Sequence, residues 1–365
     1  MSEWQTFYLK DLVKIFGGST PPTNNPKNYG NKIRWITAKD LSTLQGRYIK
    51  KGSRNISRLG FKSCSTFLLP KHAILFSVRA PIGYTAIISK RSCTDRGLMG
   101  LVPNKKIYFE FLYYLLKYHK DNISNMGVGT TFKGISKPAL GLFQVKIPPT
   151  YYEQQKIART LSVLDQKIEN NHKINELLHT LAYKIYEYYF KYKPKNAKLE
   201  QIIIENPKSS IMVKNAQKTQ DKYPFFTSGD NILSYPKAII DGRNCFLNTG
   251  GNAGIKFYVG KASYSTDTWC ICANEFSDYL YLLLSSIKTH INQSFFQGTS
   301  LKHLQKNLLK KYPIYMPSAH EIKKFNQIIM PLLTLISINT RTSKKLEQIR
   351  DFLLPLLLKQ QVKPK

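Results

Sequence analysis

Two segments of the chain carry apolar residues at alternating spacings of four and three. The first runs from Ile157 to Tyr189 and the second from Phe325 to Leu357. Such spacing is the a/d heptad pattern of a coiled coil. We therefore predict two long helices that pair along an apolar seam, although an ordinary amphipathic helix lying on its own domain would also fit. The predicted seam positions are Ile157, Leu161, Leu164, Ile168, Asn171, Leu178, Ile185, Phe325, Ile329, Leu332, Ile336, Asn339, Leu346 and Leu353.

Polar residues interrupt both heptad segments at matched depth. Asn171 and Asn175 occupy seam positions in the first segment, and Asn339 and Ser343 occupy them in the second. A buried polar residue in a seam costs stability but fixes the register of the two helices. The matched positions therefore favour one defined pairing.

The second segment departs from the pattern at three positions. Pro331 and Pro355 are expected to kink or end a helix, because proline lacks a backbone N–H. Arg350 occupies a seam position where an apolar residue is expected. We therefore predict that the second helix is the kinked or frayed member of the pair.

The chain repeats itself over a long period. Residues 149–190 align with residues 317–358 at an offset of 168, so that Pro149 matches Pro317 and Glu153 matches Glu321. Further upstream, Gly129–Lys133 resembles Gly298–Lys302, Cys93–Asp95 resembles Ser265–Asp267, and Trp35–Thr37 resembles Phe225–Thr227, with the offset widening to 169, 172 and 190. A period of this length indicates duplicated domains rather than a solenoid of short repeats.

Each copy begins with a compact part of mixed character. Short apolar runs separated by Gly, Pro and Asn predict strands. The expected strands are Ala73–Val78, Tyr84–Ile88, Ala238–Ile240, Cys245–Leu247 and Ile255–Val259, and the expected helices are Phe109–Tyr118 and Tyr279–Ile287. The predicted organisation is a globular domain over 1–150, a long helix over 151–193, a second domain over 194–317 and a second long helix over 318–360.

This organisation defines a fold class. We expect an α+β (mixed α/β) protein with two similar globular domains separated by two long antiparallel helices, which form a coiled-coil stalk with pseudo-two-fold symmetry. The 40 residues from Glu153 to Tyr192 would span about 60 Å as one helix, at about 1.5 Å per residue. Two similar domains held at a fixed spacing could read two short DNA segments.

Charge supports a polyanionic partner. Lys and Arg total 55 against 22 Asp and Glu, giving a formal charge of +33. An excess this large favours nucleic acid first and an anionic membrane second. Drift in an AT-rich coding sequence would explain a preference for lysine, but it explains the shortage of acidic residues less well.

Other features exclude several protein classes. The five cysteines are scattered without C-x-x-C spacing, so neither a zinc site nor a disulfide framework is expected. The N-terminal segment contains Glu3 and Asp11 and lacks the apolar core of a signal peptide. The longest apolar stretches are shorter than the ~20 residues of a membrane span. We expect a soluble cytoplasmic protein with reduced thiols and no contact with a membrane.

The opening of the first heptad segment carries a family resemblance. Ile147–Ala158, with Pro148-Pro149, Glu153-Gln154 and Ile157-Ala158, is followed by Leu161, Leu164-Asp165 and Ile168. This run resembles the start of the long helix after each target recognition domain in the specificity (S) subunit of type I restriction–modification enzymes. The Gly129–Lys133 segment and Gly18-x-Thr20-Pro21 are also similar to that family. The second opening, Met316–Lys324, keeps Pro317 and Glu321 but lacks the Gln and the Leu-Asp.

The resemblance implies a non-catalytic DNA-recognition subunit. Each target recognition domain would bind one half of a bipartite site in double-stranded DNA. The helices would set the spacing and recruit two modification (methyltransferase) subunits, and restriction subunits through them. S-adenosylmethionine would bind the modification subunits, so no cofactor, metal or catalytic residue is expected in this chain.

The residues themselves offer little catalytic chemistry. No Asn-Pro-Pro-Tyr or Asp-Pro-Pro-Tyr of an adenine methyltransferase occurs, and no Walker A sequence. Gly250–Gly254 is Gly-rich, but such a run more often forms a tight turn than a cofactor loop. A stand-alone DNA methyltransferase or nuclease with a built-in recognition domain, and an RNA-binding or scaffold protein, remain alternatives.

Candidate DNA contacts are the basic and amide residues near turns. Phosphate contacts need Lys or Arg, and base readout needs Arg, Asn or Gln within reach of a groove. Any one of them could instead be an ordinary solvated surface residue. The candidates are Arg54, Arg58, Arg79, Arg96 and Lys133 in the first domain and Arg243, Asn248, Asn252, Lys256 and Lys302 in the second.

Overall fold

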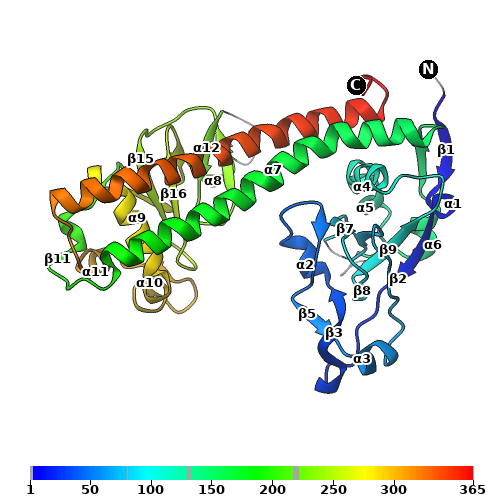
Figure 1. Cartoon of the computed structure of the whole chain (residues 1–365), viewed down its shortest axis with the longest axis horizontal. Coiled ribbons are helices and arrows are strands. Elements are labelled where there is room, and N and C mark those ends of the chain that lie inside the picture. The colour runs from blue at the N-terminus through cyan, green and yellow to red at the C-terminus, as the bar shows by residue number, and fades with distance from the viewer. Residues whose placement is uncertain (1–2, 80, 130–132, 217–221, 365) are drawn as a thin grey trace. The chain divides into compact units, whose positions relative to one another are not determined.

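The computed structural model describes residues 3–79, 81–129, 133–216 and 222–364. The chain divides into two compact units, Met1–Asn170 with Ser343–Lys365, and Asn171–Thr342. Each unit contains one globular domain and a stretch of each long helix. We call the globular part of the first unit domain 1 (residues up to 150) and that of the second unit domain 2 (residues 194–317). Figure 1 follows the chain from blue to red.

Domain 1 is built on three sheets. The largest has the strand order β2-β9-β6-β7-β4, the second has the order β5-β3-β8, and β1 pairs with β10. The strands are β1 Gln5–Tyr8, β2 Val13–Gly17, β3 Tyr29–Ile36, β4 Tyr48–Ile49, β5 Arg54–Ile56, β6 Ile74–Ser77, β7 Thr85–Ile88, β8 Cys93–Thr94, β9 Leu98–Pro103 and β10 Gln144–Ile147. Strands expected at Ala73–Val78 and Tyr84–Ile88 are confirmed as β6 and β7.

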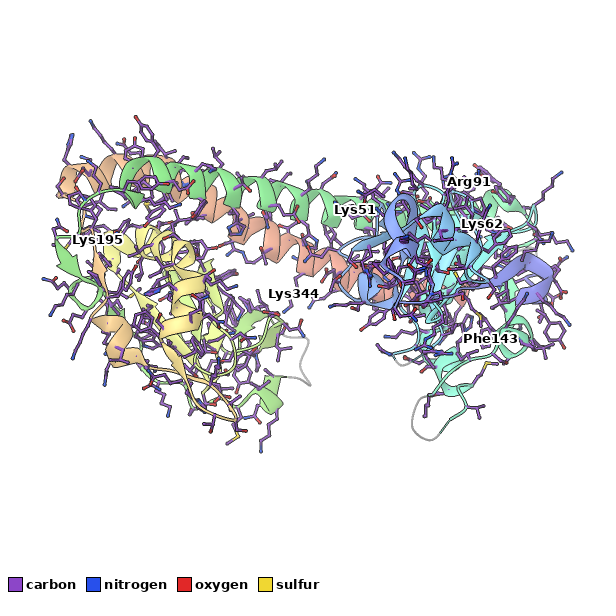
Figure 2. All side chains as sticks on the ribbon, turned by 90° about the horizontal axis from the view of Figure 1, so that it is seen from below. Lys51, Lys62, Arg91, Phe143, Lys195 and Lys344 are labelled. Atoms are coloured by element: carbon purple, nitrogen blue, oxygen red, sulfur yellow. The ribbon has the colours of Figure 1, made fainter. Side chains whose placement is uncertain are left out.

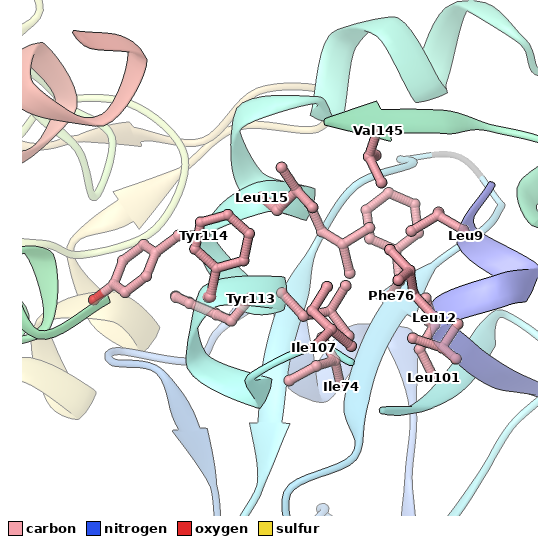
Figure 3. Close-up of a cluster of buried hydrophobic side chains, with 14 of the residues drawn as sticks. Leu9, Leu12, Ile74, Phe76, Leu101, Ile107, Tyr113, Tyr114, Leu115 and Val145 are labelled. Atoms are coloured by element: carbon pink, nitrogen blue, oxygen red, sulfur yellow. The ribbon is translucent and has the colours of Figure 1, made fainter. Parts of the chain in front are cut away.

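Short helices cover these sheets. They are α1 Leu9–Leu12, η1 Pro26–Asn28, α2 Ala38–Ser42, α3 Arg58–Lys62, α4 Phe109–Tyr118, α5 Lys120–Asn125 and α6 Lys137–Gly141. The helix expected at Phe109–Tyr118 is confirmed with the same bounds. Its buried side chains, such as Leu115, meet Phe76 from the sheet and Leu9 from α1 in one core (Figure 3). Apolar burial of this kind contributes about 25 cal/mol per Å².

Domain 2 repeats the pairings of domain 1 without a counterpart of β4. Its sheets have the orders β12-β18-β15-β16 and β14-β13-β17, β11 pairs with β21, and β19 pairs with β20. The strands are β11 Ala197–Lys198, β12 Ile204–Glu205, β13 Tyr223–Phe226, β14 Ile232–Tyr235, β15 Arg243–Asn248, β16 Ile255–Val259, β17 Ser263–Tyr264, β18 Thr268–Cys272, β19 Phe296–Gln297, β20 His303–Leu304 and β21 Pro313–Ile314. The helices are η3 Leu199–Gln201, α8 Val213–Ala216, η4 Asn274–Phe276, α9 Ser277–Ser286, α10 Lys288–Ser294 and α11 Lys306–Lys310.

Three of the expectations for domain 2 are confirmed and one is wrong. Cys245–Leu247 lies within β15, Ile255–Val259 is β16, and the helix expected at Tyr279–Ile287 is α9. Ala238–Ile240 does not form a strand. Ile240 makes only an isolated bridge to Ala262. The N–H groups of Ile239 and Ile240 both donate to the Ala262 carbonyl, so the two backbones do not continue as a regular ladder.

Strand pairing establishes the duplication and corrects its offset. In domain 1, β3 lies parallel to β8 with Trp35 opposite Cys93. In domain 2, β13 lies parallel to β17 with Phe225 opposite Ser263. Trp35 and Phe225 correspond as expected, but the partner of Cys93 is Ser263 and not Ser265. The alignment based on the shared Thr-Asp dipeptide is therefore wrong by two residues. Backbone pairing, and not the identity of two side chains, decides which residues correspond.

The two long helices begin with the same cap. Helix α7 covers Tyr151–Tyr186 and continues as a π-helical turn, η2 Glu187–Lys191, and α12 covers Ala319–Leu358. The Thr150 hydroxyl accepts a hydrogen bond from the N–H of Glu153, and the Ser318 hydroxyl accepts one from the N–H of Glu321. The Glu321 carboxylate accepts in return from the Ser318 N–H at 2.9 Å. The Ser318–Glu321 pair is a capping box, and in α7 the Thr150 hydroxyl also donates to the Glu153 carboxylate at 3.2 Å. These bonds give the repeated Pro-x-x-x-Glu spacing a structural reason.

The expected kink or fraying of the second helix is wrong. Helix α12 passes through Pro331 and Pro355 without a break. Pro331 is exposed, and so is Gln327, whose carbonyl loses its intrahelical partner and can be hydrated. Arg350 also fits, because its guanidinium donates to the Asp165 carboxylate at 2.6 Å. A charged residue is tolerated in this seam because the opposite helix supplies its counter-ion.

Candidate nucleic-acid interface

Three of the predicted DNA contacts in domain 2 have partners inside the fold. The Lys256 ammonium donates to the Thr227 carbonyl at 2.8 Å and to the Asn248 side-chain oxygen at 3.1 Å. The Asn248 amide donates to the Asn252 carbonyl at 3.1 Å. Burial lowers the pKa of Lys256. This network ties β15 to the turn before β16, so Asn248 and Lys256, which were predicted to face DNA, have their polar groups engaged inside domain 2.

Arg243 is also a structural residue. Its guanidinium is paired with the Asp278 carboxylate at the start of α9 and donates to the Thr334 hydroxyl of α12 at 3.0 Å. The Arg243 side chain is 17% exposed and that of Asp278 is 2% exposed. The donors of Arg243, which was predicted to contact DNA, therefore bind the domain to the long helix.

The remaining two candidates of domain 2 lie on one edge. Asn252 and Lys302 are both exposed. The Gly251 N–H donates to the Lys302 carbonyl at 2.9 Å, and Gly250 forms a β-bridge with His303. The turn after β15 and the loop before β20 are therefore held together, and their polar side chains can share a ligand.

Domain 1 presents the corresponding edge. Arg79 forms a β-bridge with Gly134, and the Ile135 N–H donates to the Val78 carbonyl at 2.9 Å. This pairing brings Arg79 beside Lys133, and both are exposed. Exposed Arg96 lies in the turn between β8 and β9. The Val78 N–H donates to the Gly97 carbonyl of this turn at 2.9 Å, which places the turn beside the end of β6. Thr130, Thr131 and Phe132 of the Gly-Thr segment lie outside the described residues.

Arg54 and Arg58 occupy a different part of domain 1. Both are exposed, Arg54 on β5 and Arg58 at the start of α3. The Arg54 guanidinium lies 3.9 Å from the centroid of the Tyr29 ring. Sequence reasoning missed the other cations of this region, Lys32, Arg34 and Arg91. Arg91 is labelled on domain 1 in Figure 2, together with Lys51 and Lys62.

The predicted seam positions are all at least partly covered. Seven are buried, namely Ile157, Leu161, Ile168, Asn171, Phe325, Ile329 and Ile336, and seven are half-buried, namely Leu164, Leu178, Ile185, Leu332, Asn339, Leu346 and Leu353. In the second unit the Asn339 amide donates to the Asn175 side-chain oxygen at 2.9 Å, and the ring of Tyr189 contacts that of Phe325. Rising numbers on α7 thus meet falling numbers on α12, which makes the pair antiparallel.

The helices also pack on their own domains. Ile157, Ala158 and Leu161 of α7 belong to the core of domain 1. Phe325, Ile329 and Leu333 of α12 belong to the core of domain 2. The two interpretations of the heptads, a helix pair and a helix lying on its domain, are therefore both correct. Leu333 was missed because it falls one residue beyond the predicted seam position Leu332.

A second apolar row on each helix stays exposed. On α7 it includes Ile174, Leu177 and Leu181, of which Leu177 is 63% exposed. On α12 the corresponding row includes Ile349 and Phe352, of which Phe352 is 69% exposed. Their spacing of three and four is that of a helix face that meets a partner helix.

Candidate chemistry elsewhere is sparse. Within residues 3–364, apart from the gaps given above, no group of three or more His, Cys, Asp or Glu side chains is placed to hold a metal ion. Among the same residues no helix has the length and apolarity to cross a membrane. The most prominent features are exposed basic residues in the loops of two similar domains and exposed apolar faces on the long helices. They define a class of binding protein with two similar recognition domains.

Comparison with known proteins places the chain in a family. The family described as "Type I restriction modification DNA specificity domain" matches residues 1–180 and 195–348, and this chain belongs to it. The chain is similar to the specificity subunit of the type I restriction enzyme MjaIX from Methanocaldococcus jannaschii, with 29% identity over 98% of this chain and 93% of that protein. It is 24% identical to a putative type I specificity subunit of Mycoplasma genitalium over 84% of this chain and 80% of the relative.

A solved structure has the same fold. The S subunit of a type I restriction–modification system from M. genitalium superposes with a TM-score of 0.63 at 18% identity, covering 97% of this chain and 96% of that one. The expected fold class, two α+β domains with two long antiparallel helices, is confirmed.

Proposed function

We propose that this chain is the non-catalytic DNA-specificity subunit of a type I restriction–modification complex. Domain 1 binds one half of a bipartite target in double-stranded DNA, and domain 2 binds the other half. The observation that carries the proposal is the duplication: two domains that share the pairings β2-β9-β6-β7 and β12-β18-β15-β16 present basic loops at the same edge, and each packs on the long helix that follows it.

The residues proposed to contact DNA are the candidates whose side chains are exposed. Arg79, Arg96 and Lys133 of domain 1 and Asn252 and Lys302 of domain 2 lie on the matched edges. Their donors suit phosphate and base acceptors. Arg54 and Arg58 are exposed elsewhere on domain 1 and are secondary candidates.

The long helices connect the two domains and bind the modification subunits. Their exposed apolar rows suit helices of modification subunits, two per complex, which carry S-adenosylmethionine and methylate adenine. Restriction subunits join through them. The complex acts on DNA in the cytoplasm. This chain supplies recognition and spacing and holds no cofactor.

The test is reconstitution. The full chain is mixed with its modification subunits, S-adenosylmethionine and genomic DNA, and methylated adenines are mapped. We expect one bipartite motif, and none without this chain. Inserting one helical turn, about 5.4 Å, into both α7 and α12 should change the spacer between the half-sites and leave both half-sites the same. Methylation by the isolated chain would instead identify a stand-alone enzyme.

A further inference from the structure

Domain 1 has an open pocket that is lined by cations. It has a volume of about 320 Å³ and lies on the face of β3 and β5. Lys32, Arg34 and Arg91 line it over an apolar floor that includes Ile33. No acidic residue is among its described lining residues. An uncompensated group of three cations around a pocket creates a positive potential that favours an anion.

The pocket also holds an unsatisfied polar atom. Asn55 stands opposite Arg34 in the β3–β5 pairing and lines the pocket. Its side-chain oxygen is buried without a hydrogen-bond partner among the described residues. Such a group costs free energy unless a ligand or water satisfies it. By rotation, the same carboxamide can present either its oxygen or its NH₂ group.

Domain 2 has a pocket in the matching place. It has a volume of about 490 Å³ and is lined by Tyr223, Lys237 and Lys261, with Asp241. Lys237 and Lys261 are exposed. The pocket lies at the end of β14, which is the strand that pairs with β13 as β5 pairs with β3.

Strand register shows that the two pockets share two lining positions and lie on the same part of the duplicated fold. Arg91 lies two residues before Cys93, and Lys261 lies two residues before Ser263, which is the residue that corresponds to Cys93. Ile33 and Tyr223 likewise precede the matched residues Trp35 and Phe225 by two. The duplicated fold has thus kept a cation and an open pocket at one site in both domains, although the side chains differ.

A ligand that occurs twice per chain, is anionic and has several acceptor oxygens fits both pockets. We propose that each pocket binds one phosphodiester group of the DNA backbone and so anchors its domain on the duplex independently of base sequence. This proposal rests on the proposed function and adds contacts apart from the loop edges. Lys32, Arg34 and Arg91 donate to the phosphate oxygens in domain 1, and Lys237 and Lys261 do so in domain 2. The first pocket binds more strongly, because Asp241 offsets part of the charge of the second.

The experiment measures DNA affinity against salt concentration for the complex of the full chain with its modification subunits. The variants are Lys32→Gln with Arg91→Gln in the first pocket, and Lys237→Gln with Lys261→Gln in the second. The matched control is Lys14→Gln with Lys146→Gln, two exposed cations on β2 and β10 with the same change of charge. All six residues are exposed, so the variants should fold, and melting curves check this.

For the first pocket we expect affinity to fall about tenfold, the size of one lost charged hydrogen-bond contact. The slope of log affinity against log salt should fall by about 0.9, the value for one phosphate. The second pocket should lose about threefold with a smaller change of slope. Target and scrambled duplexes should be affected equally, and the methylated motif should not change.

Two results would overturn the proposal. A slope equal to that of the control variant would mean that no phosphate is bound there, leaving an acidic partner protein as the pocket's ligand. A loss confined to the target duplex would mean that the pockets read bases. Failure of the proposed function looks different, because the unaltered complex would then methylate no bipartite motif and show no preference for any duplex.

Discussion

At equivalent positions of the two long helices, the first unit has a buried ion pair and the second unit has apolar residues. In the first unit, the Asp165 carboxylate accepts from Arg350 and from the Tyr114 hydroxyl, each at 2.6 Å. At the repeat offset of 168, the equivalents of Asp165 and Arg350 in the second unit are Leu333 and Ala182, which both belong to its apolar core. Replacing a buried ion pair by well-packed apolar residues is often neutral or stabilising, because the charges no longer have to be desolvated.

The first turn of each long helix shows the same exchange. Gln154 of α7 is 1% exposed, donates to the Lys106 and Pro148 carbonyls and accepts from the Tyr108 N–H. Its counterpart in α12 is Ile322, 3% exposed and within the apolar core. The second opening therefore lacks the family's glutamine because its domain offers an apolar surface there.

In both units an arginine joins a helix of the domain to a long helix. In the first, Arg47 joins Glu110 of α4 to Glu169 of α7, at 3.0 Å and 3.1 Å. In the second, Arg243 joins Asp278 of α9 to Thr334 of α12. Glu110 and Asp278 correspond at the offset of 168, but the two arginines come from different places in the chain. Each domain is thus attached to its helix by an arginine that bridges both elements.

The largest effect is expected from removing half of the ion pair in the first unit. Arg350→Ala leaves Asp165, with a side chain only 6% exposed, without its cation, and should lower the free energy of unfolding by about 3 kcal/mol. Adding Asp165→Leu with Tyr114→Phe removes the buried carboxylate together with the hydroxyl that donates to it, and should restore most of this loss. Urea denaturation measures both variants. If the triple variant were as unstable as the single one, the two units would not be equivalent at this position.

The arginine bridge of the second unit should have the next largest effect. Arg243→Met should cost about 2 kcal/mol at neutral pH, because it leaves the Asp278 carboxylate buried without its charged donor. Arg341→Met is the control, since Arg341 also joins α12 to domain 2 but is exposed. A cost no greater than that of the control would show that the bridge does not stabilise the attachment.

The same variant should be sensitive to pH. Burial already holds the pKa of Asp278 above its usual value, so the folded state retains this proton to a higher pH than the unfolded state does. This carboxyl therefore contributes less stability as the pH rises above about 4. Without Arg243 its pKa should rise further, and the stability difference between wild type and variant should widen from pH 4 to pH 7. A constant difference would indicate that Asp278 is neutral throughout.

The polar pair of the second unit should contribute less. Asn339→Leu removes the bond to Asn175 and should cost about 1 kcal/mol. A double-mutant cycle with Asn175→Leu should give a coupling of about 0.5–1 kcal/mol, as for residues in direct contact. Additive effects in denaturation would mean that the two amides do not interact in solution.

Removing the N-cap hydroxyl should lower stability by nearly the same amount in the two long helices. Thr150→Ala and Ser318→Ala should each cost about 1 kcal/mol, because each removes the acceptor for one helix N–H. Thermal unfolding should show similar losses for both. A loss for Thr150→Ala alone would mean that α12 does not depend on its capping box.

The sequence alone determined the long helices, the duplication and the bounds of α4. Heptad spacing, a Thr or Ser with Glu three residues later, and a long apolar run are local patterns, and local hydrogen bonds and helical periodicity are enough to produce the elements they predict. The exposure of Arg79, Arg96 and Lys133 could be expected for the same reason, since charged side chains next to turns remain in water.

Only the tertiary structure decided the rest. Arg243 and Arg79 both adjoin strands, yet one is paired with Asp278 and the other is exposed. Arg350 stands in a seam only because Asp165, far away in the sequence, faces it. The matched pockets depend on which strands lie next to β3 and β13. Strand order and the partner of a buried charge are set by contacts between distant residues, and no local periodicity encodes them.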